Sequence, residues 1–137
     1  MTEESNTSGA SGNVILVEDD KLLRSIVKEA LEEKGIEIIF DTSSVSEALM
    51  FAKKHKPQAA VIDYHLGAGP NGIDLANGLR KHDPSIGIVL LTTYLNLSAH
   101  PAQFAKVPQG TRFLAKDTLS DISILIQEIE VAASEVA

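Results

Sequence analysis

Short runs of consecutive apolar residues alternate along the chain with longer segments in which apolar residues recur every three or four positions. The first pattern is typical of buried strands and the second of amphipathic helices. Five apolar runs predict five strands, at residues 14–17, 36–40, 59–62, 86–91 and 111–115. Strands that alternate with helices form a parallel sheet with helices packed on its faces. The pattern therefore predicts an α/β fold.

A helical segment follows each run, and local residues mark several helix ends. The residues at helical spacing are Leu23, Ile26, Val27, Ala30 and Leu31; Ala48, Leu49 and Ala52; Leu75, Ala76 and Leu79; and Ile122, Leu125, Ile126, Ile129 and Ala133. A Lys-Gly pair at 34–35 is expected to close the first helix, and Ser44 with Glu47 predicts a capping box for the second. Pro101 and Pro108 confine the fourth helix to about two turns.

Length and composition indicate one globular domain. Residues 1–12 are almost without apolar side chains and are expected to form a flexible tail, which leaves residues 13–137 for the domain. The 12 basic and 19 acidic residues give a net charge of -7, which argues against nucleic acid as a direct partner. The chain has no cysteine, no apolar run of the roughly 20 residues that a membrane span needs, and no signal peptide pattern. We therefore expect a cytoplasmic protein with no membrane contact.

Polar side chains follow four of the predicted strands. Glu18 and Asp19 end the first strand, Asp63 the third, Thr92 the fourth and Lys116 the fifth. The carboxyl ends of parallel strands share one edge of the sheet, where ligands of open α/β folds bind. If the first strand is central, the three carboxylates come within several ångströms of one another. Two such charges about 4 Å apart repel by about 4 kcal/mol at an effective dielectric of 20, so the edge requires a cation.

A hard divalent cation matches these ligands. Mg2+, or Mn2+ in its place, prefers oxygen ligands and is typically held by one or two carboxylates together with a substrate phosphate. A carboxylate beside a metal, an ammonium group and a hydroxyl makes a phosphoryl-transfer site. In such a site Asp63 is the nucleophile, Lys116 offsets charge and Thr92 donates to a phosphoryl oxygen.

Four short segments then carry a resemblance to a known family. In order and approximate spacing, the segments Val17-Glu18-Asp19-Asp20, Val61-Ile62-Asp63, Leu91-Thr92 and Phe113-Leu114-Ala115-Lys116 resemble the receiver domain of two-component response regulators. The resemblance implies a flavodoxin-like, doubly wound, five-stranded parallel sheet of order 2-1-3-4-5. It also implies that Asp63 accepts a phosphoryl group from a histidine kinase or a phosphotransfer protein. Phosphorylation would switch a protein-interaction surface, and the domain would catalyse only its own phosphorylation and dephosphorylation.

The same resemblance assigns roles to further residues. It implies that Asp19 ligates Mg2+ directly, that Glu18 does so largely through water, and that the backbone carbonyl of His65 is another ligand. Phe113 matches an aromatic position whose rotamer follows the movement of the threonine on the fourth strand. His65 and Tyr94 match positions that tune hydrolysis of the aspartyl phosphate. Both are large, so we expect slow dephosphorylation.

Several of these residues also have purely structural interpretations. Asp20 is expected to begin the first helix, where the helix dipole favours a negative charge. Thr92 suits any strand, Phe113 suits any core, and Lys116 suits an ordinary surface. Asp117 stands where the family usually has proline after the lysine, which leaves the geometry of the bond between 116 and 117 open.

Other function classes compete with a receiver domain. The segment Gly67-Ala68-Gly69-Pro70-Asn71-Gly72 fits the nucleotide-binding pattern G-x-G-x-x-G. However, it begins four residues beyond Asp63, and no acid follows the next strand to bind a ribose. A turn is therefore a simpler interpretation of this segment than a nucleotide site. A Mg2+-dependent phosphohydrolase usually has an acid where this chain has His65. A degenerate receiver that only binds a partner would have lost Asp63 or Lys116. The receiver would act on a downstream protein, or on an output domain removed from a longer regulator.

Overall fold

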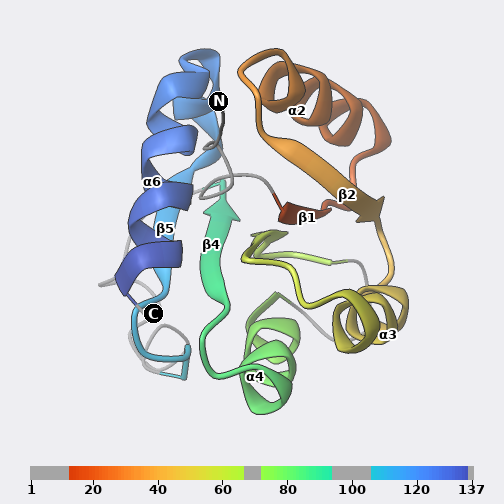
Figure 1. Ribbon diagram of the computed structural model, residues 1–137. Coiled ribbons are helices and arrows are strands. Elements are labelled where there is room, and N and C mark those ends of the chain that lie inside the picture. The colour runs from red at the N-terminus through yellow and green to blue at the C-terminus, as the bar shows by residue number, and fades with distance from the viewer. Residues whose placement is uncertain (1–12, 67–71, 94–105, 136–137) are drawn as a thin grey trace, which may run out of the picture.

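The computed structural model describes residues 13–66, 72–93 and 106–135, and these contain a five-stranded parallel sheet of order β2-β1-β3-β4-β5 (Figure 1). The strands are β1 (Asn13–Val17), β2 (Glu37–Thr42), β3 (Ala59–Asp63), β4 (Gly87–Thr92) and β5 (Arg112–Ala115). The predicted fold class and strand order are confirmed. The expected tail at residues 1–12 and residues 101–105 of the expected fourth helix lie outside the described residues.

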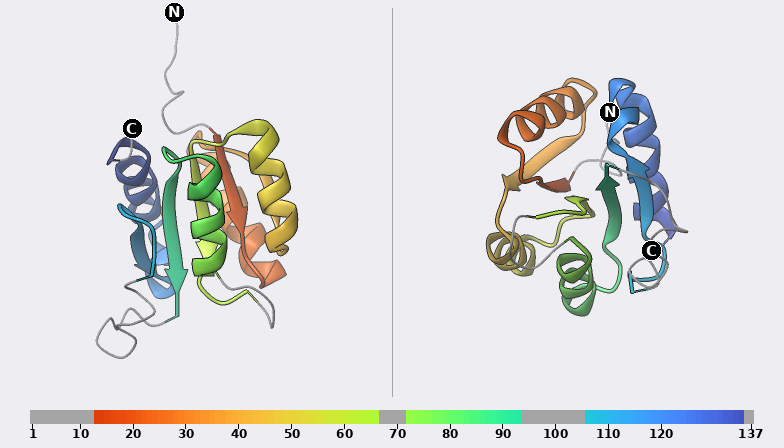
Figure 2. Two further views of the ribbon diagram at one scale, coloured as in Figure 1. Left: turned by 90° about the horizontal axis from the view of Figure 1, so that it is seen from below. Right: turned by 180° about the vertical axis from the view of Figure 1, so that it is seen from behind.

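Helices cover both faces of this sheet. They are α2 (Lys21–Glu33), α3 (Val45–His55), α4 (Gly72–His82) and α6 (Ile122–Glu135), and a 3-10 helix, η2 (Lys116–Ser120), follows β5. Helices α2 and α6 lie on one face and α3 and α4 on the other (Figures 1 and 2). The helix η2 was not predicted from the sequence. None of the described helices combines the length and the apolar character that a membrane crossing needs.

Alternate residues of the central strands supply two separate cores. Val14 and Leu16 of β1 face α2 and α6, whereas Ile15 and Val17 face α3 and α4. The helical residues of the first core include Val27, Leu31, Leu125 and Ile129, and those of the second include Ala48, Leu75, Ala76 and Leu79. A sheet covered on both faces buries nearly every residue of its central strands, which explains the uninterrupted apolar runs.

The apolar face of α6 differs by one position from the prediction. Ala132 is fully buried in the core, whereas the expected Ala133 is only partly buried. The reason is the close approach of α6 to β4. A Cβ atom added at Gly87 would lie 2.7 Å from the backbone carbon of Ala132, so the helix backbone rests directly on this glycine.

Local hydrogen bonds explain the helix ends. Gly35 adopts a φ of 91° beyond α2, as expected of a glycine that closes a helix. The Ser44 side chain accepts a hydrogen bond from Glu47 N at 3.2 Å, which confirms half of the predicted capping box. The other half is wrong, because Glu47 Oε1 instead accepts from Thr42 Oγ1 at 2.6 Å.

The second strand extends further than its apolar run. It begins at Glu37 and continues through the polar Asp41 and Thr42, because Leu16 pairs with Asp41 and Val17 pairs with Thr42. Pairing with β1 therefore determines where β2 ends. This extension brings Asp41 and Thr42 beside the turn that follows β1.

Candidate functional site

Polar side chains from the ends of four strands lie at one edge of the sheet. Glu18 follows β1, Asp63 ends β3, Thr92 ends β4 and Lys116 follows β5. Glu18, Asp63 and Thr92 are only 1%, 3% and 4% exposed, respectively. Burying a polar group is unfavourable unless it is paired, so these side chains need partners at this edge.

Lys116 connects two of the carboxylates. Its Nζ atom lies 3.1 Å from Asp63 Oδ1 and 3.4 Å from each carboxylate oxygen of Glu18. Asp63 Oδ1 also accepts a hydrogen bond from His65 N at 3.1 Å. When both acids are ionised, two negative charges share one ammonium group. The centre then carries an excess of negative charge.

Glu18 is held by its backbone and by its side chain. Its N–H donates to the Thr42 carbonyl at 3.0 Å, and its Oε2 atom accepts from Asp20 N at 3.0 Å. Burial raises the pKa of Glu18 from 4.5 to about 7. The hydrogen bond from Asp20 opposes this rise, and the negative charge of Asp63 adds to it. Glu18 therefore takes up a proton at a higher pH than an ordinary glutamate does.

The pKa of Lys116 is also raised, but by its charged neighbours rather than by burial. Burial disfavours its ammonium form, but the hydrogen bonds and charges of Asp63 and Glu18 outweigh burial and raise the pKa of Lys116. The residue begins η2, and Thr118 Oγ1 in that helix donates to the Ala115 carbonyl at 2.6 Å. The peptide bond between Lys116 and Asp117 is trans. Lys116 thus stays cationic at neutral pH.

The three consecutive acids after β1 occupy different environments. Asp20 caps α2, because its Oδ1 accepts from Leu22 N at 3.0 Å and from Leu23 N at 3.1 Å, and its expected role at the helix start is confirmed. The side chain of Asp19 is exposed. Of the three carboxylates expected together, Glu18 and Asp63 share Lys116. The described residues contain no group of three or more His, Asp or Glu side chains spaced to hold a metal.

The donors at the site nevertheless fit a hard divalent cation. Glu18 Oε1 is buried and accepts no hydrogen bond from any described residue. Mg2+ keeps several waters and typically needs only one or two carboxylates, so a cluster of three is not required. Asp63 and Glu18 supply buried carboxylate oxygens, and Asp19 supplies an exposed one at the adjacent turn. An additional cation would also offset the excess negative charge.

Thr92 and Phe113 lie on the two strands beside this centre. Thr92 pairs with Ala115 in the register of β4 and β5, directly before Lys116. Phe113 pairs with Leu90 and packs, partly buried, against the core under α3 and α4. Both residues have further interactions with other side chains or backbone groups. The structure thus puts Thr92 at the edge and Phe113 two residues behind it.

Of the two residues predicted to tune dephosphorylation, His65 and Tyr94, the structure describes only His65. The His65 side chain is exposed and lies edge-on to the ring of Tyr64, with ring centroids 4.6 Å apart. Its backbone N–H is the group that contacts Asp63. Tyr94, like residues 67–71 of the glycine-containing segment, lies outside the described residues.

Two contributors to the site were missed from the sequence. Gly72 begins α4 against the backbone of residues 63 and 64: an added Cβ would clash with the Asp63 carbonyl oxygen and lie 3.0 Å from Tyr64 Cα. Arg24 donates from Nη1 to the Glu18 carbonyl at 2.9 Å. The sequence Pro-Asn-Gly predicted a turn at Gly72, but it did not predict that this glycine would contact the backbone of Asp63. No local sequence pattern indicated the contact of Arg24 with Glu18.

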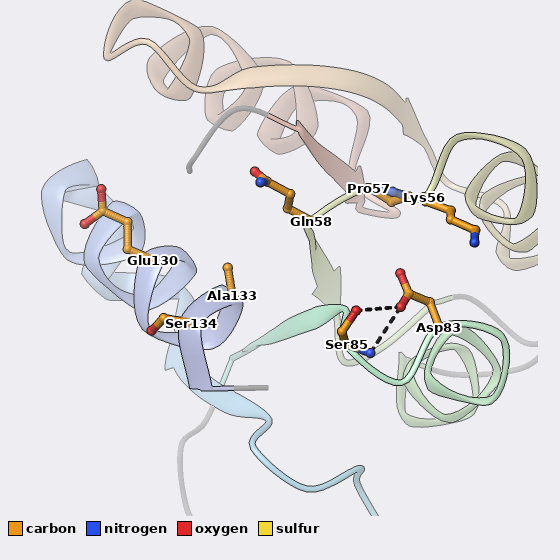
Figure 3. Close-up of a pocket in the computed structure, with 8 residues that line it drawn as sticks. All are labelled: Lys56, Pro57, Gln58, Asp83, Ser85, Glu130, Ala133 and Ser134. Atoms are coloured by element: carbon orange, nitrogen blue, oxygen red, sulfur yellow. Dashed lines mark hydrogen bonds between the residues drawn. The ribbon is translucent and has the colours of Figure 1, made fainter. Parts of the chain in front are cut away.

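A pocket of about 620 Å3 lies at the opposite edge of the sheet (Figure 3). Its lining comes from the residues before β3 and β4 and from the end of α6: Lys56, Pro57, Gln58, Asp83, Ser85, Glu130, Ala133 and Ser134. Asp83 Oδ1 is already bonded to the backbone N and the hydroxyl of Ser85. None of the strand-end residues described above contributes to this pocket.

Comparison with known proteins agrees with this arrangement. The family model described as the response regulator receiver domain matches residues 14–129. The photosynthetic apparatus regulatory protein RegA of Rhodobacter capsulatus is 33% identical over 116 residues, which cover 83% of this chain and 60% of that protein. The transcriptional regulatory protein PdtaR of Mycobacterium tuberculosis is 31% identical over 121 residues, covering 88% and 56%. The chain spans about half the length of the curated relatives it matches.

Solved structures share the fold. The response regulator domain of Thermotoga maritima CheB superposes with a TM-score of 0.74 at 16% identity, over 89% of this chain and 96% of that one. The receiver domain of the Francisella response regulator 1452 gives a TM-score of 0.73 at 22% identity, over 90% and 98%. These structural similarities show the fold alone, whereas the match to the family model shows similarity in sequence. The chain belongs to the family of response regulator receiver domains of two-component systems.

Proposed function

We propose that residues 13–137 form a phosphorylation-controlled receiver domain in which Asp63 accepts the phosphoryl group. One observation carries this proposal: Asp63 is buried at the end of β3, and Lys116 Nζ lies 3.1 Å from its carboxylate. A buried carboxylate can act as a nucleophile, and an ammonium group held beside it can neutralise the negative charge of the phosphoryl group that it receives. Family membership implies a histidine kinase as donor, either directly or through a phosphotransfer protein.

In the proposed reaction a carboxylate oxygen of Asp63 attacks phosphorus. The bond between phosphorus and the imidazole nitrogen of the donor breaks, and its electron pair returns to that nitrogen. Lys116 offsets the charge on the phosphoryl oxygens, and the Thr92 hydroxyl donates to one of them. A bound Mg2+ or Mn2+ supplies further charge neutralisation at these oxygens. The domain performs no chemistry beyond its own phosphorylation and dephosphorylation.

The proposed ligands of the cation come from two strand ends. Asp19 and Asp63 would bind it directly, Glu18 would bind largely through water, and the backbone carbonyl of His65 would be the remaining protein ligand. The buried Glu18 Oε1 without a hydrogen bond and the excess negative charge support this set. The exposed position of Asp19 leaves its carboxylate accessible at the rim of the site.

Phosphorylation would act as a switch through β4 and β5. Thr92 would move toward the phosphoryl oxygens and Phe113 would repack, which shifts an equilibrium between two surfaces. Support comes from the direct pairing of these strands at Thr92 with Ala115 and at Leu90 with Phe113. The altered surface would engage a downstream protein, or an output domain of a longer chain. Transfer from a histidine kinase would take place in the cytoplasm.

Intact-protein mass spectrometry tests the proposal. The protein is incubated with acetyl phosphate or phosphoramidate, with and without Mg2+, as wild type and as Asp63→Asn. We expect the mass of one phosphoryl group to be added only when both Mg2+ and Asp63 are present. No adduct in the wild type, together with no beryllofluoride complex, would favour a phosphorylation-independent binding module.

The lifetime of the adduct is a separate prediction. Large residues at His65 and Tyr94 are expected to limit access of the hydrolytic water, so the aspartyl phosphate should persist well beyond seconds. Replacing either residue by alanine should shorten its half-life, measured as loss of the adduct after the donor is removed. A wild-type half-life of seconds that neither substitution changes would contradict the prediction.

A further inference from the structure

Arg24 on α2 has no role in the proposed chemistry, but it joins two segments of the chain. Its Nη1 atom donates to the Glu18 carbonyl oxygen at 2.9 Å, and its Nε atom donates to Asp41 Oδ2 at 3.2 Å. Glu18 follows β1 and Asp41 lies in β2, so one side chain spans the helix, the turn and the edge strand. A guanidinium group can do this because its donors form a rigid planar fork.

The bond to the Glu18 carbonyl matters because of the peptide to which it belongs. That carbonyl shares a planar unit with the N–H of Asp19, so fixing the oxygen fixes the orientation of the peptide that leads to Asp19. On the other side, the Glu18 N–H donates to the Thr42 carbonyl at 3.0 Å. Glu18 is therefore held at both of its backbone polar groups. The acidic turn between β1 and α2 cannot rotate without breaking one of these bonds.

Asp41 determines how Arg24 is presented. The Asp41 carboxylate accepts from Arg24 through Oδ2 and is paired with Lys28 Nζ through Oδ1 at 3.2 Å. Arg24 and Asp41 are both largely shielded from solvent, with side chains 18% and 29% exposed. A charge-assisted bond in this setting orients the guanidinium plane toward Glu18. Lys28 shares the Asp41 partner, one helical turn further along, and is not bonded to Glu18 in the described contacts.

We infer that Arg24 is a positioning residue for the acidic turn: oriented by Asp41, it fixes the Glu18 carbonyl and thereby presents the Glu18 and Asp19 carboxylates to a divalent cation. This inference rests on the proposed function, because it takes these two acids as the cation ligands. Groups that hold metal ligands in place typically change metal affinity or activity by about 10- to 100-fold when they are replaced.

Lys28 provides a matched control for a merely structural role. Both Arg24 and Lys28 tie α2 to β2 through Asp41, but only Arg24 reaches the turn. Arg24→Lys keeps the charge and a comparable helix propensity but cannot supply two donors in a fixed fork. Lys28→Met removes an ion pair of the same helix with the same aspartate. A role limited to joining the helix to the strand would make the two variants behave alike.

The experiment measures two properties of the full chain without a phosphoryl donor. Isothermal titration calorimetry with MgCl2 gives the Mg2+ affinity, and amide hydrogen exchange in metal-free buffer gives the protection of the Asp20 N–H, which is bonded to Glu18 Oε2. We expect Arg24→Lys to bind Mg2+ about tenfold more weakly and to exchange the Asp20 amide faster. We expect Lys28→Met to match the wild type in both. Asp41→Asn should fall between them.

The two readouts separate this inference from the proposed function. An Arg24→Lys variant with wild-type Mg2+ affinity and an unchanged Asp20 amide would overturn the inference. Asp19→Asn tests the ligand set: if it binds Mg2+ as well as the wild type does, the proposed ligand role of Asp19 fails. In that case the exchange of the Asp20 amide, which involves no metal, still decides whether Arg24 holds the turn.

Discussion

At the scale of single residues, Glu18 links the stability of the fold to pH. Its pKa is about 7 in the folded chain, against an ordinary value of 4.5. Between these values the folded chain binds more protons at Glu18 than the unfolded chain does. The contribution of Glu18 to the free energy of unfolding therefore falls as pH rises through this window. Lys116 adds no slope here, because its raised pKa gives stability that is lost only above its ordinary value of 10.5.

Replacing Glu18 should remove this pH dependence. Without Mg2+, we expect the stability of Glu18→Gln relative to the wild type to increase by up to about 3 kcal/mol between pH 5 and pH 8. The reason is that glutamine carries no charge to be buried beside Asp63. Urea unfolding of both proteins at the two pH values measures this difference. Equal pH dependence in both proteins would mean that Glu18 titrates as an ordinary surface acid.

Residue identity and position predicted part of this site. An acid directly before an amphipathic helix predicted the cap at Asp20, and strand ends predicted that Asp63 and Lys116 would lie together, which they do at 3.1 Å. The different environments of Glu18 and Asp19 could not be predicted. Both acids follow the same strand, and their burial depends on contacts with β2 and β5 that are distant in the sequence.

At the scale of elements, the two acids at the start of α2 have different expected roles: Asp20 caps the helix, and Asp19 is a proposed ligand of the cation. Asp20→Ala should cost about 1 kcal/mol of stability, because it removes the side chain that caps two N–H groups, but it should still form the Mg2+-dependent adduct. Asp19→Asn should keep the wild-type stability and lose most of the adduct. Urea unfolding and intact mass spectrometry on the same samples check both variants. An adduct lost in Asp20→Ala but kept in Asp19→Asn would reverse the assignment.

The start of α4 depends on a glycine. Gly72→Ala should cost about 1 to 3 kcal/mol and slow phosphorylation, because the new methyl group must displace the backbone that carries Asp63. Gly78→Ala is the control in the same helix, since its Cβ would meet only the end of the flexible Leu49 side chain. Urea unfolding and the rate of adduct formation distinguish the two. If both variants had similar stability and similar rates of adduct formation, the backbone before α4 would be able to accommodate the added methyl group without displacing Asp63.

Element ends were harder to predict than element types. Apolar runs predicted all five strands of the sheet, since a doubly covered sheet requires them. They did not predict that β2 would continue through Asp41 and Thr42, because the pairing partner β1 determines that end. The contact of Arg24 with Asp41 follows from this extension. Arg24 and Asp41 are 17 residues apart in the sequence, which is too far for a local sequence pattern to predict their contact.

At the scale of the whole molecule, the two edges of the sheet have different properties. The site edge carries the buried acids and Lys116, whereas the opposite edge carries the pocket beside Ser85 (Figure 3). The six residues of β4 connect Gly87 at the pocket edge to Thr92 at the site edge. At about 3.3 Å per residue, these ends lie about 17 Å apart. β4 is therefore a direct, buried connection between the site and the pocket.

Because the central strands are packed on both faces, we expect the response to phosphorylation to remain near the site edge and to spread sideways into β5. Addition of beryllofluoride and Mg2+ to isotope-labelled protein should shift the amide resonances of Phe113 and Lys116 strongly and that of Ser85 weakly. Thr92→Ala should still bind beryllofluoride, while the shifts in β5 shrink, because the variant lacks the hydroxyl that is proposed to move toward the phosphoryl oxygens beside Ala115. Equal shifts at both edges, or β5 shifts that do not depend on Thr92, would mean that the signal leaves the site by another route, such as the turn before α4.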